Sequence, residues 1–544
     1  MPLPTAECDV LVVGSGNAGF SAALSAAETL LPSGQKPTVL LIDKCPEEWV
    51  GGNSYFTAGA YRTVHDGLED VLPLVNNVSS EKATKIDLAP YTNENFAKDM
   101  ENVCAGRSDK ELSRALIADS RSTVKWLAGH GIRFQLSFNR QAYEVDGRFK
   151  FWGGLCLKTE DGGKGLIADH LAAAKNSGVL LSWGTGLKGV KRQTECGQHR
   201  YLATVLDEGV ERIISTNAIV FAAGGFESNP RMRSQYLGPG WDMAMVRGTP
   251  YNMGDCIELA IRDLDALPVG NWSGCHATCW DANADPSVGN REASNEYTKS
   301  GYPLGLMINV EGDRFVDEGV AMRNYTYAKF GRAILQQPDH VAFQIWDART
   351  THWLRSEEYR PERLKENRFE AETFEELAGV LSSHGLKDCA KFLGTCRDYN
   401  SATYAFQREN PSVKWDPSVL DGVSTQSSKI QLPLPKSNWA LPLDKGPFLA
   451  VKVTCGVTFT FGGLKVDAEN AQLISATTRQ PISGLFCVGE MMGGLFYQNY
   501  PGGSGLTSGA VFGRRAGRAA AASGGEACTT SPCYHCTESA TLRK

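Results

Sequence analysis

Three glycines near the start of the chain have the spacing of a phosphate-binding turn. Gly14, Gly16 and Gly19 form a G-x-G-x-x-G pattern. In such a turn the first glycine permits a tight bend, the second lets the backbone approach a pyrophosphate, and the third lets a helix pack close to a strand. The free N–H groups at the start of that helix would face the phosphates. The pattern therefore predicts a dinucleotide-binding site.

The segments around these glycines are the ones that such a site requires. Residues 9–13 are almost wholly apolar and rich in branched side chains, which is typical of a strand buried on both faces of a parallel sheet. An alanine-rich helix is predicted over 18–31. A second strand, 38–42, ends at Asp43, an acid that could bind ribose hydroxyls. This order predicts an α/β fold with a Rossmann-like dinucleotide-binding domain.

A second glycine turn, residues 51–54, follows directly and is not expected to be a simple linker in so regular a region. An ordinary doubly wound nicotinamide enzyme has no need of this loop, whereas a flavoprotein must hold a longer, buried dinucleotide along its whole length. A third pair, Gly224 and Gly225, ends a predicted strand at the place where a ligand lies in an open parallel sheet, although this strand could also be plain core. These features favour a flavin dinucleotide.

The composition is that of an ordinary globular protein. The net charge of -6 over 544 residues argues against a nucleic-acid surface, and no apolar run approaches the roughly 18 residues that span a bilayer. The 15 cysteines lack the spacing of an iron–sulfur site, so most are expected to be free thiols. With no signal peptide in the sequence, they favour the cytoplasm.

The last residues of the sequence leave an alternative open. Cys528, Cys533, His535 and Cys536 could be drawn as a metal site, but a flexible tail over 524–544 is the preferred interpretation because no complementary half of such a site exists elsewhere. No metal is expected.

The amino-acid composition changes twice along the chain. Residues 264–447 are polar and aromatic-rich, with a predicted helix over 373–384, whereas glycine-rich strands and turns, including a turn at Gly462 and Gly463, return afterwards. A further helix, 108–130, is predicted from a Ser108-x-x-Glu111 capping box. We expect a dinucleotide domain made of 1–263 and 448–523, with 264–447 inserted as a separate domain.

The sequence resembles the flavoproteins of the fumarate reductase and succinate dehydrogenase class, in its soluble branch. The resemblance rests on the first glycine turn and on GGNSYFTAGAYRTVHD, FVDEGVAMRNYTYAKFGRAIL and GEMMGGLFYQNYPGG, which are most similar to tricarballylate dehydrogenases. It covers residues 7–520 and implies an FAD-binding domain with an inserted α+β capping domain. The residues that it places against FAD are Gly14, Ser15, Gly16, Asn17, Ala18, Gly19, Asp43, Lys44, Gly51, Gly52, Asn53, Ser54, Thr57, Ala58, Gly59, Ala223, Gly224, Gly225, Gly489, Glu490, Ser504, Gly505, Leu506 and Thr507.

The resemblance also bears on how FAD is held. Family members that link FAD covalently carry a histidine just ahead of the second glycine turn, whereas this chain has Glu47, Glu48, Trp49 and Val50 there. Noncovalent FAD is therefore expected. The helix predicted over 505–522 could stabilise negative charge at the pyrimidine end of the reduced flavin.

The resemblance implies a first candidate for proton transfer, Arg323. In fumarate reductases the proton donor is an arginine in a motif like E-x-x-x-R, and the matching region here contains Glu318 and Arg323, offset by one residue. Arginine is almost always charged, so it is a natural acid, although Arg323 could instead only anchor a carboxylate or an internal acid.

The dicarboxylate clamp of fumarate reductases is replaced in this chain. Its histidine and arginine fall on Phe459 and Tyr500, so fumarate and succinate are poor substrate candidates. Tyr500-Pro501-Gly502 is similar to a turn of 3-ketosteroid dehydrogenases, in which a tyrosine takes the proton next to a carbonyl. Alternatively, Tyr500 only walls the pocket beside Phe496.

Three further polar residues lie near the glycine motifs. Arg62, His65 and Arg247 could bind substrate carboxylates, with the best claim for Arg62, although a structural role is the preferred interpretation for each. The preferred hypothesis is an FAD-dependent dehydrogenase or reductase of a CH–CH bond beside a carboxylate or carbonyl. The alternatives are an oxidase or desaturase of a larger carbonyl metabolite that uses oxygen, and an electron-carrying flavoprotein subunit. A small-molecule substrate and a separate electron acceptor are the expected partners.

Overall fold

The structure, a computed structural model, describes residues 3–31, 33–195 and 198–523. Its first large element is an eight-stranded sheet with the order β10-β11-β12-β1-β2-β9, to which β20 and β19 add beside β12. The strands are β1 (Glu7–Val13), β2 (Val39–Ile42), β9 (Leu180–Ser182), β10 (Thr185–Glu195), β11 (Gln198–Asp207), β12 (Val210–Phe221), β19 (Gln472–Ile474) and β20 (Pro481–Cys487). The two strands predicted first, β1 and β2, are parallel neighbours, so the predicted α/β fold is confirmed.

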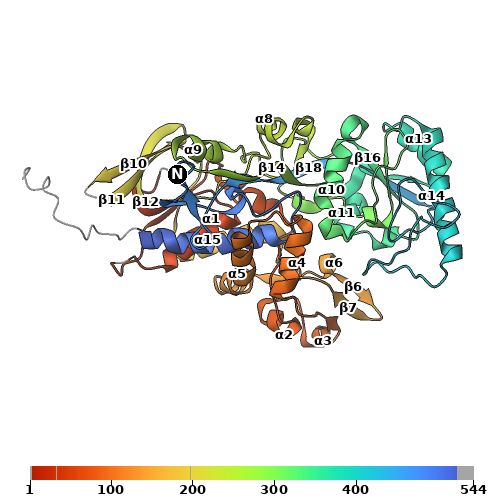
Figure 1. Cartoon of the computed structure of the whole chain (residues 1–544), viewed down its shortest axis with the longest axis horizontal. Helices are drawn as coiled ribbons and strands as arrows, with labels where there is room; N and C mark the ends of the chain where they lie inside the picture. Colours follow the sequence, from red (N-terminus) through yellow and green to blue (C-terminus); the bar gives the residue numbers. More distant parts are fainter. Residues whose placement is uncertain (1–2, 32, 196–197, 524–544) are drawn as a thin grey trace, which may run out of the picture.

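Both ends of the chain build this sheet and its helical cover. β1 pairs in parallel with β12, which pairs in parallel with β20 from the C-terminal part. α1 (Asn17–Glu28) and α15 (Ser504–Ser523) lie side by side beneath it (Figure 1). The other helices of this region are α5 (Lys110–Gly129), α7 (Gly162–Asn176), α8 (Pro230–Met232) and α9 (Asp255–Asp263). The start of α1 and the start of α15 are therefore brought to one place.

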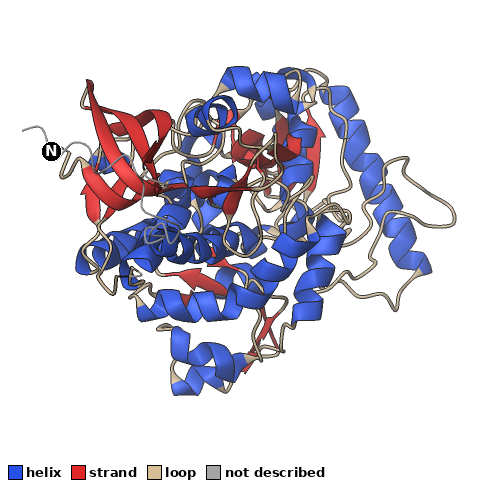
Figure 2. Cartoon of the chain, turned by 60° about the vertical axis from the view of Figure 1, so that its left-hand side comes forward, coloured by secondary structure: helices blue, strands red, loops and turns tan. Residues whose placement is uncertain are grey.

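A six-stranded sheet forms the second layer of the molecule. Its members are β13 (Met245–Val246), β14 (Pro268–Asp281), β15 (Leu306–Asn309), β16 (Ala342–Trp346), β17 (Phe369–Ala371) and β18 (Phe448–Leu464). The helices beside it are α10 (Tyr327–Leu335), α11 (Ser356–Tyr359), α12 (Pro361–Leu364), α13 (Phe374–Ser382) and α14 (Cys389–Glu409). Figure 2 shows most helices arranged around the two larger sheets.

The long strand β18 joins the two parts of the molecule. Its first residues pair with β16 and β17, and its later residues pair with β14. The six-stranded sheet thus extends across the boundary predicted at residue 447, and the division into domains stays a prediction. The predicted turn at Gly462 and Gly463 is wrong, because both glycines lie inside β18. A Cβ on Gly463 would lie 2.2 Å from the Met491 carbonyl oxygen, so a neighbouring backbone rather than a bend requires glycine there.

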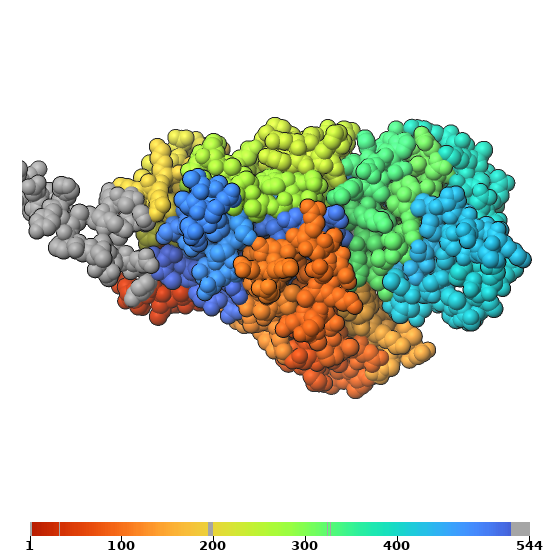
Figure 3. All heavy atoms as spheres, in the orientation of Figure 1, coloured from red at the N-terminus to blue at the C-terminus, as the bar shows by residue number. Residues whose placement is uncertain are grey.

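Residues 60–159 add a smaller lobe that projects below the body (Figure 3). It holds two three-stranded sheets and short helices: β3 (Ala60–Tyr61), β4 (Ile86–Asp87), β5 (Phe134–Leu136), β6 (Ala142–Val145), β7 (Arg148–Phe151), β8 (Leu157–Thr159), α2 (Leu68–Val71), α3 (Ser80–Ala83), α4 (Asn93–Val103) and α6 (Phe138–Gln141).

Two helix starts test the predicted caps. Thr373 and Glu376 form the predicted capping box at α13. The cap predicted at Ser108 is wrong, because Asp109 accepts the hydrogen bonds from the first backbone N–H groups of α5 while the Ser108 hydroxyl donates to the Leu495 carbonyl. The predicted tail over 524–544 and the metal alternative at Cys528, Cys533, His535 and Cys536 lie outside the described residues.

Candidate active site

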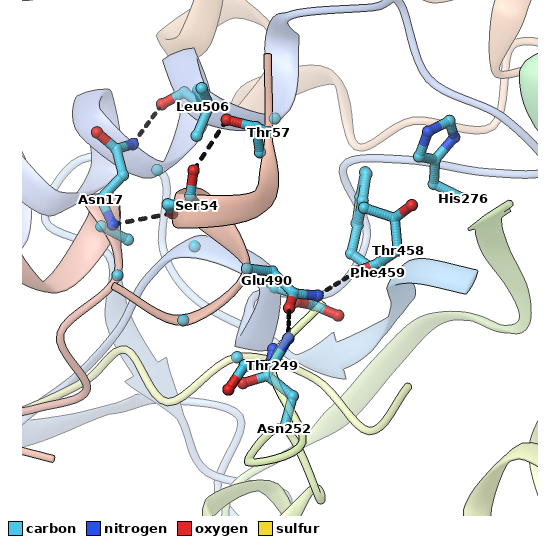
Figure 4. A pocket seen from close by; sticks show the side chains of 18 of the residues that line it. Asn17, Ser54, Thr57, Thr249, Asn252, His276, Thr458, Phe459, Glu490 and Leu506 are labelled. Carbon is cyan, nitrogen blue, oxygen red and sulfur yellow. Dashed lines mark hydrogen bonds between the residues drawn. The ribbon is translucent and has the colours of Figure 1, made fainter. Parts of the chain in front are cut away.

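A cavity at the carboxyl ends of β1, β2 and β12 is lined by residues from both ends of the chain (Figure 4). It gathers most of the residues that the sequence placed against a dinucleotide. These lining residues are Gly14, Ser15, Gly16, Asn17, Ala18, Asp43, Lys44, Gly52, Asn53, Ser54, Thr57, Ala58, Ala223, Gly224, Gly489, Glu490, Gly505 and Leu506.

Six of the predicted cofactor residues lie behind this lining: Gly19, Gly51, Gly59, Gly225, Ser504 and Thr507. The glycines among them allow close packing. A Cβ on Gly19 would lie 1.9 Å from the Gly14 carbonyl oxygen, and a Cβ on Gly225 would lie 2.1 Å from Glu490 Oε1. They shape the wall of the cavity without reaching its surface.

Asn17 ties the two glycine turns to the start of α15. Its backbone N–H donates to Ser54 Oγ at 3.0 Å, and its side-chain amide donates to the Leu506 carbonyl at 2.8 Å (Figure 4). The Tyr61 hydroxyl donates to Asn17 Oδ1 at 2.6 Å. Three segments that are far apart in the sequence are thereby fixed around the same space.

Asp43 closes the first glycine turn at the end of β2. Its Oδ2 accepts hydrogen bonds from the Ser15 N–H at 2.8 Å and the Ser15 hydroxyl at 2.6 Å. Its Oδ1 accepts from the Cys45 N–H at 3.0 Å. The carboxylate therefore stands beside the turn with its position fixed, as a ribose-binding acid requires.

These features fit a dinucleotide with a long linker. The two glycine turns lie close together, since a Cβ on Gly52 would lie 4.0 Å from Gly16 Cα. Because glycine has no side chain, neither residue fills the space between the turns. Residues of the first turns of α1 and α15 line the cavity, so the N-terminal ends of both helices, which carry a partial positive charge, lie at it. Backbone donors at two helix starts suit the phosphates of FAD and a negatively charged flavin ring.

Three arginines line the same cavity as Tyr500. They are Arg140, Arg247 and Arg323. Arg247 Nη1 donates to Thr458 Oγ1 at 2.7 Å, and Arg323 Nη2 donates to the Arg140 carbonyl at 3.3 Å. The acids that line the cavity are Asp43, Asp255 and Glu490, from other segments. Guanidinium groups in this arrangement can bind carboxylates.

Tyr500 lies among aromatic rings. The centroid of its ring is 4.9 Å from that of His276 and 4.9 Å from that of Phe459, both in edge arrangements, and 5.6 Å from that of Phe496. Burial, with the nearby Arg247 charge, lowers the pKa of His276 well below its usual value, so this imidazole is neutral at neutral pH.

Three residues predicted for the site lie outside the cavity lining. Arg62 is fully buried, with Nη1 donating to the Tyr91 hydroxyl at 2.8 Å and to Asp99 Oδ2 at 2.6 Å, and Nε donating to the Gly502 carbonyl at 2.9 Å. It supports the turn that carries Tyr500 from behind, which is a structural role.

His65 and Glu318 also have structural partners. His65 is buried, its Nδ1 accepts from the Gly67 N–H, and burial lowers its pKa to about 4. Glu318 is fully buried, where it accepts a hydrogen bond from the Met307 N–H at 2.9 Å and pairs with Arg314. Neither side chain is placed to touch a substrate.

Sequence reasoning missed His276 and Arg140 as lining residues. His276 lies in β14, where it is the direct partner of Phe459 in β18. That pairing joins segments almost two hundred residues apart, which no local pattern shows. The signal that was available is a lone histidine in the strand CHATCW, whose other residues are all buried.

The sheet topology, the paired glycine turns and the cavity between them define a flavin-binding dinucleotide fold. A sequence model described as "FAD binding domain" matches residues 9–506, and the chain belongs to this family. Among the described residues, no helix is both long enough and apolar enough to cross a bilayer.

Known proteins similar to the chain are flavoenzymes. The chain is 27% identical over 524 residues to a probable fumarate reductase, Ifc3, of Shewanella frigidimarina, covering 95% of this chain and 75% of the relative. It is 26% identical over 532 residues to a vinyl phenol reductase of Lactiplantibacillus plantarum, covering 94% and 96%. The predicted likeness to the fumarate reductase class is thus confirmed, and the chain is an FAD-dependent oxidoreductase.

A solved structure supports the fold. The 3-ketosteroid Δ1-dehydrogenase of Sterolibacterium denitrificans matches with a TM-score of 0.68 and 18% identity, covering 95% of this chain and 100% of that one. At this identity the match concerns the fold alone.

Proposed function

We propose that the protein catalyses oxidation of a CH–CH bond beside a carboxylate, or reduction of the corresponding C=C bond, in a substrate that carries several carboxylates, of the tricarballylate type. The observation that carries the proposal is that three arginines, Arg140, Arg247 and Arg323, line the same FAD cavity as Tyr500. Guanidinium groups bind carboxylates, and Arg140 is already paired with Glu357 at 3.6 Å. The names of the fumarate and vinyl phenol reductases support chemistry at a carbon–carbon double bond.

The chain's own residues would orient the substrate and move one proton. FAD, when bound, supplies hydride transfer at its flavin N5. Arg247 and Arg140 would hold carboxylates, while Arg323 or Tyr500 would transfer the proton on the neighbouring carbon. Arg323 suits the direction of reduction, because its guanidinium group is protonated at neutral pH. Tyr500 suits oxidation, because a phenolate can accept a proton. Neutral His276 would donate a hydrogen bond without adding charge.

A second candidate is dehydrogenation of a larger carbonyl compound such as a cyclic enone. It is favoured by the Tyr500-Pro501-Gly502 turn and by the aromatic wall of Phe459, Phe461 and Phe496. An apolar wall would accept a ring, and Tyr500 would take the proton beside the carbonyl. In this alternative oxygen or another acceptor would reoxidise the cofactor.

We further propose that FAD is held noncovalently, since residues 47–50 contain no histidine. The eleven cysteines among the described residues are free thiols. They support the proposal of a cytoplasmic, reducing environment.

The test is an anaerobic screen in which bleaching of the FAD absorbance reports oxidation of an added compound. We expect tricarballylate to bleach the wild-type holoprotein faster than succinate or a cyclic enone. Arg323→Ala and Tyr500→Phe should each slow bleaching about 100-fold, the usual contribution of a proton-transfer group, with FAD still bound. Bleaching by enones alone would favour the second candidate, and no bleaching by any of these compounds would overturn both.

Matched controls come from exposed residues far from the cavity. Arg231→Ala and Tyr404→Phe remove the same functional groups from α8 and α14. They should leave the bleaching rate unchanged. Equal slowing in these variants and in the site variants would show that the effect is not local to the cavity.

A further inference from the structure

Two glutamate side chains meet at the wall of the FAD cavity. Glu490 lines the cavity, and its Oε1 accepts hydrogen bonds from the Thr460 N–H at 2.7 Å and the Thr460 hydroxyl at 3.1 Å. Glu227, which follows Gly225 by two residues, is fully buried, and its carboxyl group is near enough to that of Glu490 for each to alter the pKa of the other. Glu490 and Asn252 lie together on one side of the cavity (Figure 4).

Only one carboxylate oxygen of Glu227 accepts hydrogen bonds from the surrounding residues. Oε1 accepts from the side-chain amides of Asn53 and Asn252. Oε2 is buried and receives no hydrogen bond from any donor group among the described residues. A buried carboxylate oxygen without a donor is costly, and a carboxylate in contact with a second carboxylate adds repulsion. A proton on Glu227 removes both costs because the acid can donate to Glu490.

The direction of the pKa shifts agrees with this arrangement. Burial, with the neighbouring Glu490 charge, raises the pKa of Glu227 well above its usual value. Burial raises the pKa of Glu490 to about 6, while the hydrogen bond with Glu227 opposes this rise. The two groups titrate as a pair, so at neutral pH one proton and one negative charge are shared between them.

We propose that Glu227 is the neutral acid of this pair and that its O–H fixes Glu490 as an anionic acceptor for a hydroxyl of FAD. Glu227 is then a positioning residue for cofactor binding, one step behind the cavity surface. FAD carries hydroxyls that need acceptors, and the carboxylate oxygens of Glu490 are acceptors only. The inference rests on FAD binding and is independent of the substrate proposed above.

Other titratable groups near the pair do not change with pH in the relevant range. Arg233, from the π-helical turn Arg233–Leu237, donates to the backbone carbonyls of Glu227, Trp241 and Asp242 rather than to the carboxyl group. Cys275 of β14 faces Glu227, and burial raises its pKa to about 12. Loss of the shared proton is therefore the titration that alters this wall as the pH rises above neutral.

The experiment measures FAD release from the diluted holoprotein by flavin fluorescence, from about pH 7 to about pH 9. In the wild type we expect the Kd to rise as the pH increases, because a second negative charge repels Glu490 from its position. Glu227→Gln keeps a neutral donor of the same shape, so its Kd should equal the low-pH wild-type value and stay flat. Glu227→Ala should raise the Kd about tenfold or more at every pH, since Glu490 loses its partner.

Two further measurements keep the proposal falsifiable. Glu81→Gln, the same change on the exposed helix α3, should behave as the wild type at every pH. Infrared difference spectra should show the carbonyl stretch of a protonated carboxylic acid in the wild type and lose it in Glu227→Gln. A wild-type Kd that is independent of pH, or a Glu227→Gln protein that releases FAD or fails to fold, would overturn the proposal.

Discussion

A single buried carboxylate, Glu358 of α11, lies near enough to Arg140 and Arg323 of the site for their charges to act on it. Its Oε2 accepts from the Ser300 N–H at 2.9 Å and the Ser300 hydroxyl at 2.6 Å, and its Oε1 accepts from Arg355 at 3.0 Å. Burial alone would raise its pKa, but the charges of Arg355 and Arg140 and the Ser300 hydrogen bond lower that pKa to about 2. Glu358 is therefore ionised over the whole physiological range.

This shift makes a prediction about pH and stability. A carboxylate whose pKa is lowered by folding stabilises the native state above its unfolded pKa, and the contribution is lost as the pH falls toward the folded pKa. Glu358→Gln should lower the free energy of unfolding by about 3 kcal/mol at neutral pH, because the folded protein holds this pKa at about 2 instead of 4.5. The difference from the wild type should shrink as the pH falls from about 4.5 toward 2.

Urea unfolding at neutral and at acidic pH measures this difference. Glu370→Gln, which removes an exposed carboxylate paired with Arg368, is the control and should change stability by less than about 1 kcal/mol. A Glu358→Gln effect of the same size at both pH values would contradict the assigned shift.

Single residues differ in how far the sequence predicts their place. Gly14, Gly16 and Asp43 could be assigned because their function depends on a local order of strand, turn, helix and strand. Arg62 could not, because its partner Asp99 comes from the separate helix α4 and its burial is a property of the whole lobe. The role of Glu227 could not be predicted, because it depends on Glu490, which comes more than two hundred residues later in the chain.

At the scale of elements, the contact between α1 and α15 sets the shape of the FAD cavity. The helices approach so closely that a Cβ on Gly517 would lie 2.1 Å from the Ala22 carbonyl oxygen. The run of small residues correctly predicted the C-terminal helix, but it did not predict that this helix packs against α1.

Gly517→Ala should therefore destabilise the protein, by about 1–3 kcal/mol, because the backbones of two helices must separate. Gly394→Ala is the matched control, since Gly394 lies inside α14 with nothing within 4 Å of the added Cβ. It should stabilise the protein by about 0.5–1 kcal/mol through helix propensity alone. Thermal unfolding of the two holoproteins compares them, and stabilisation by both changes would show that α1 and α15 are not in tight contact.

Strands were harder to predict than helices. β18 is buried along almost all of its 17 residues, so it shows no alternation of polar and apolar positions. Its internal glycines indicated a turn when the sequence was considered alone. The strand is continuous because Gly462 and Gly463 admit Trp272 and the backbone near Met491, contacts that only the assembled sheet supplies.

At the scale of the whole molecule, β18 links the FAD cavity to the capping region. Its first residues pair with β16 and β17, whereas Phe459 and Thr460, further along the same strand, line the cavity. If one of the two parts unfolded alone, β18 would lose its pairing with that part. The other part would then be destabilised, because it is built on the same strand. The protein should therefore unfold as one cooperative unit, even though the sequence predicts two domains.

Calorimetry of the holoprotein tests this expectation. FAD binds the native state only, so a free FAD concentration about 100 times the Kd should add about 2.7 kcal/mol of stability. With β18 acting as the link, added FAD should move a single transition to higher temperature as a whole. Two transitions, of which FAD moves only one, would show that the capping region unfolds on its own and that the pairing of β18 with β16 and β17 does not couple it to the cavity.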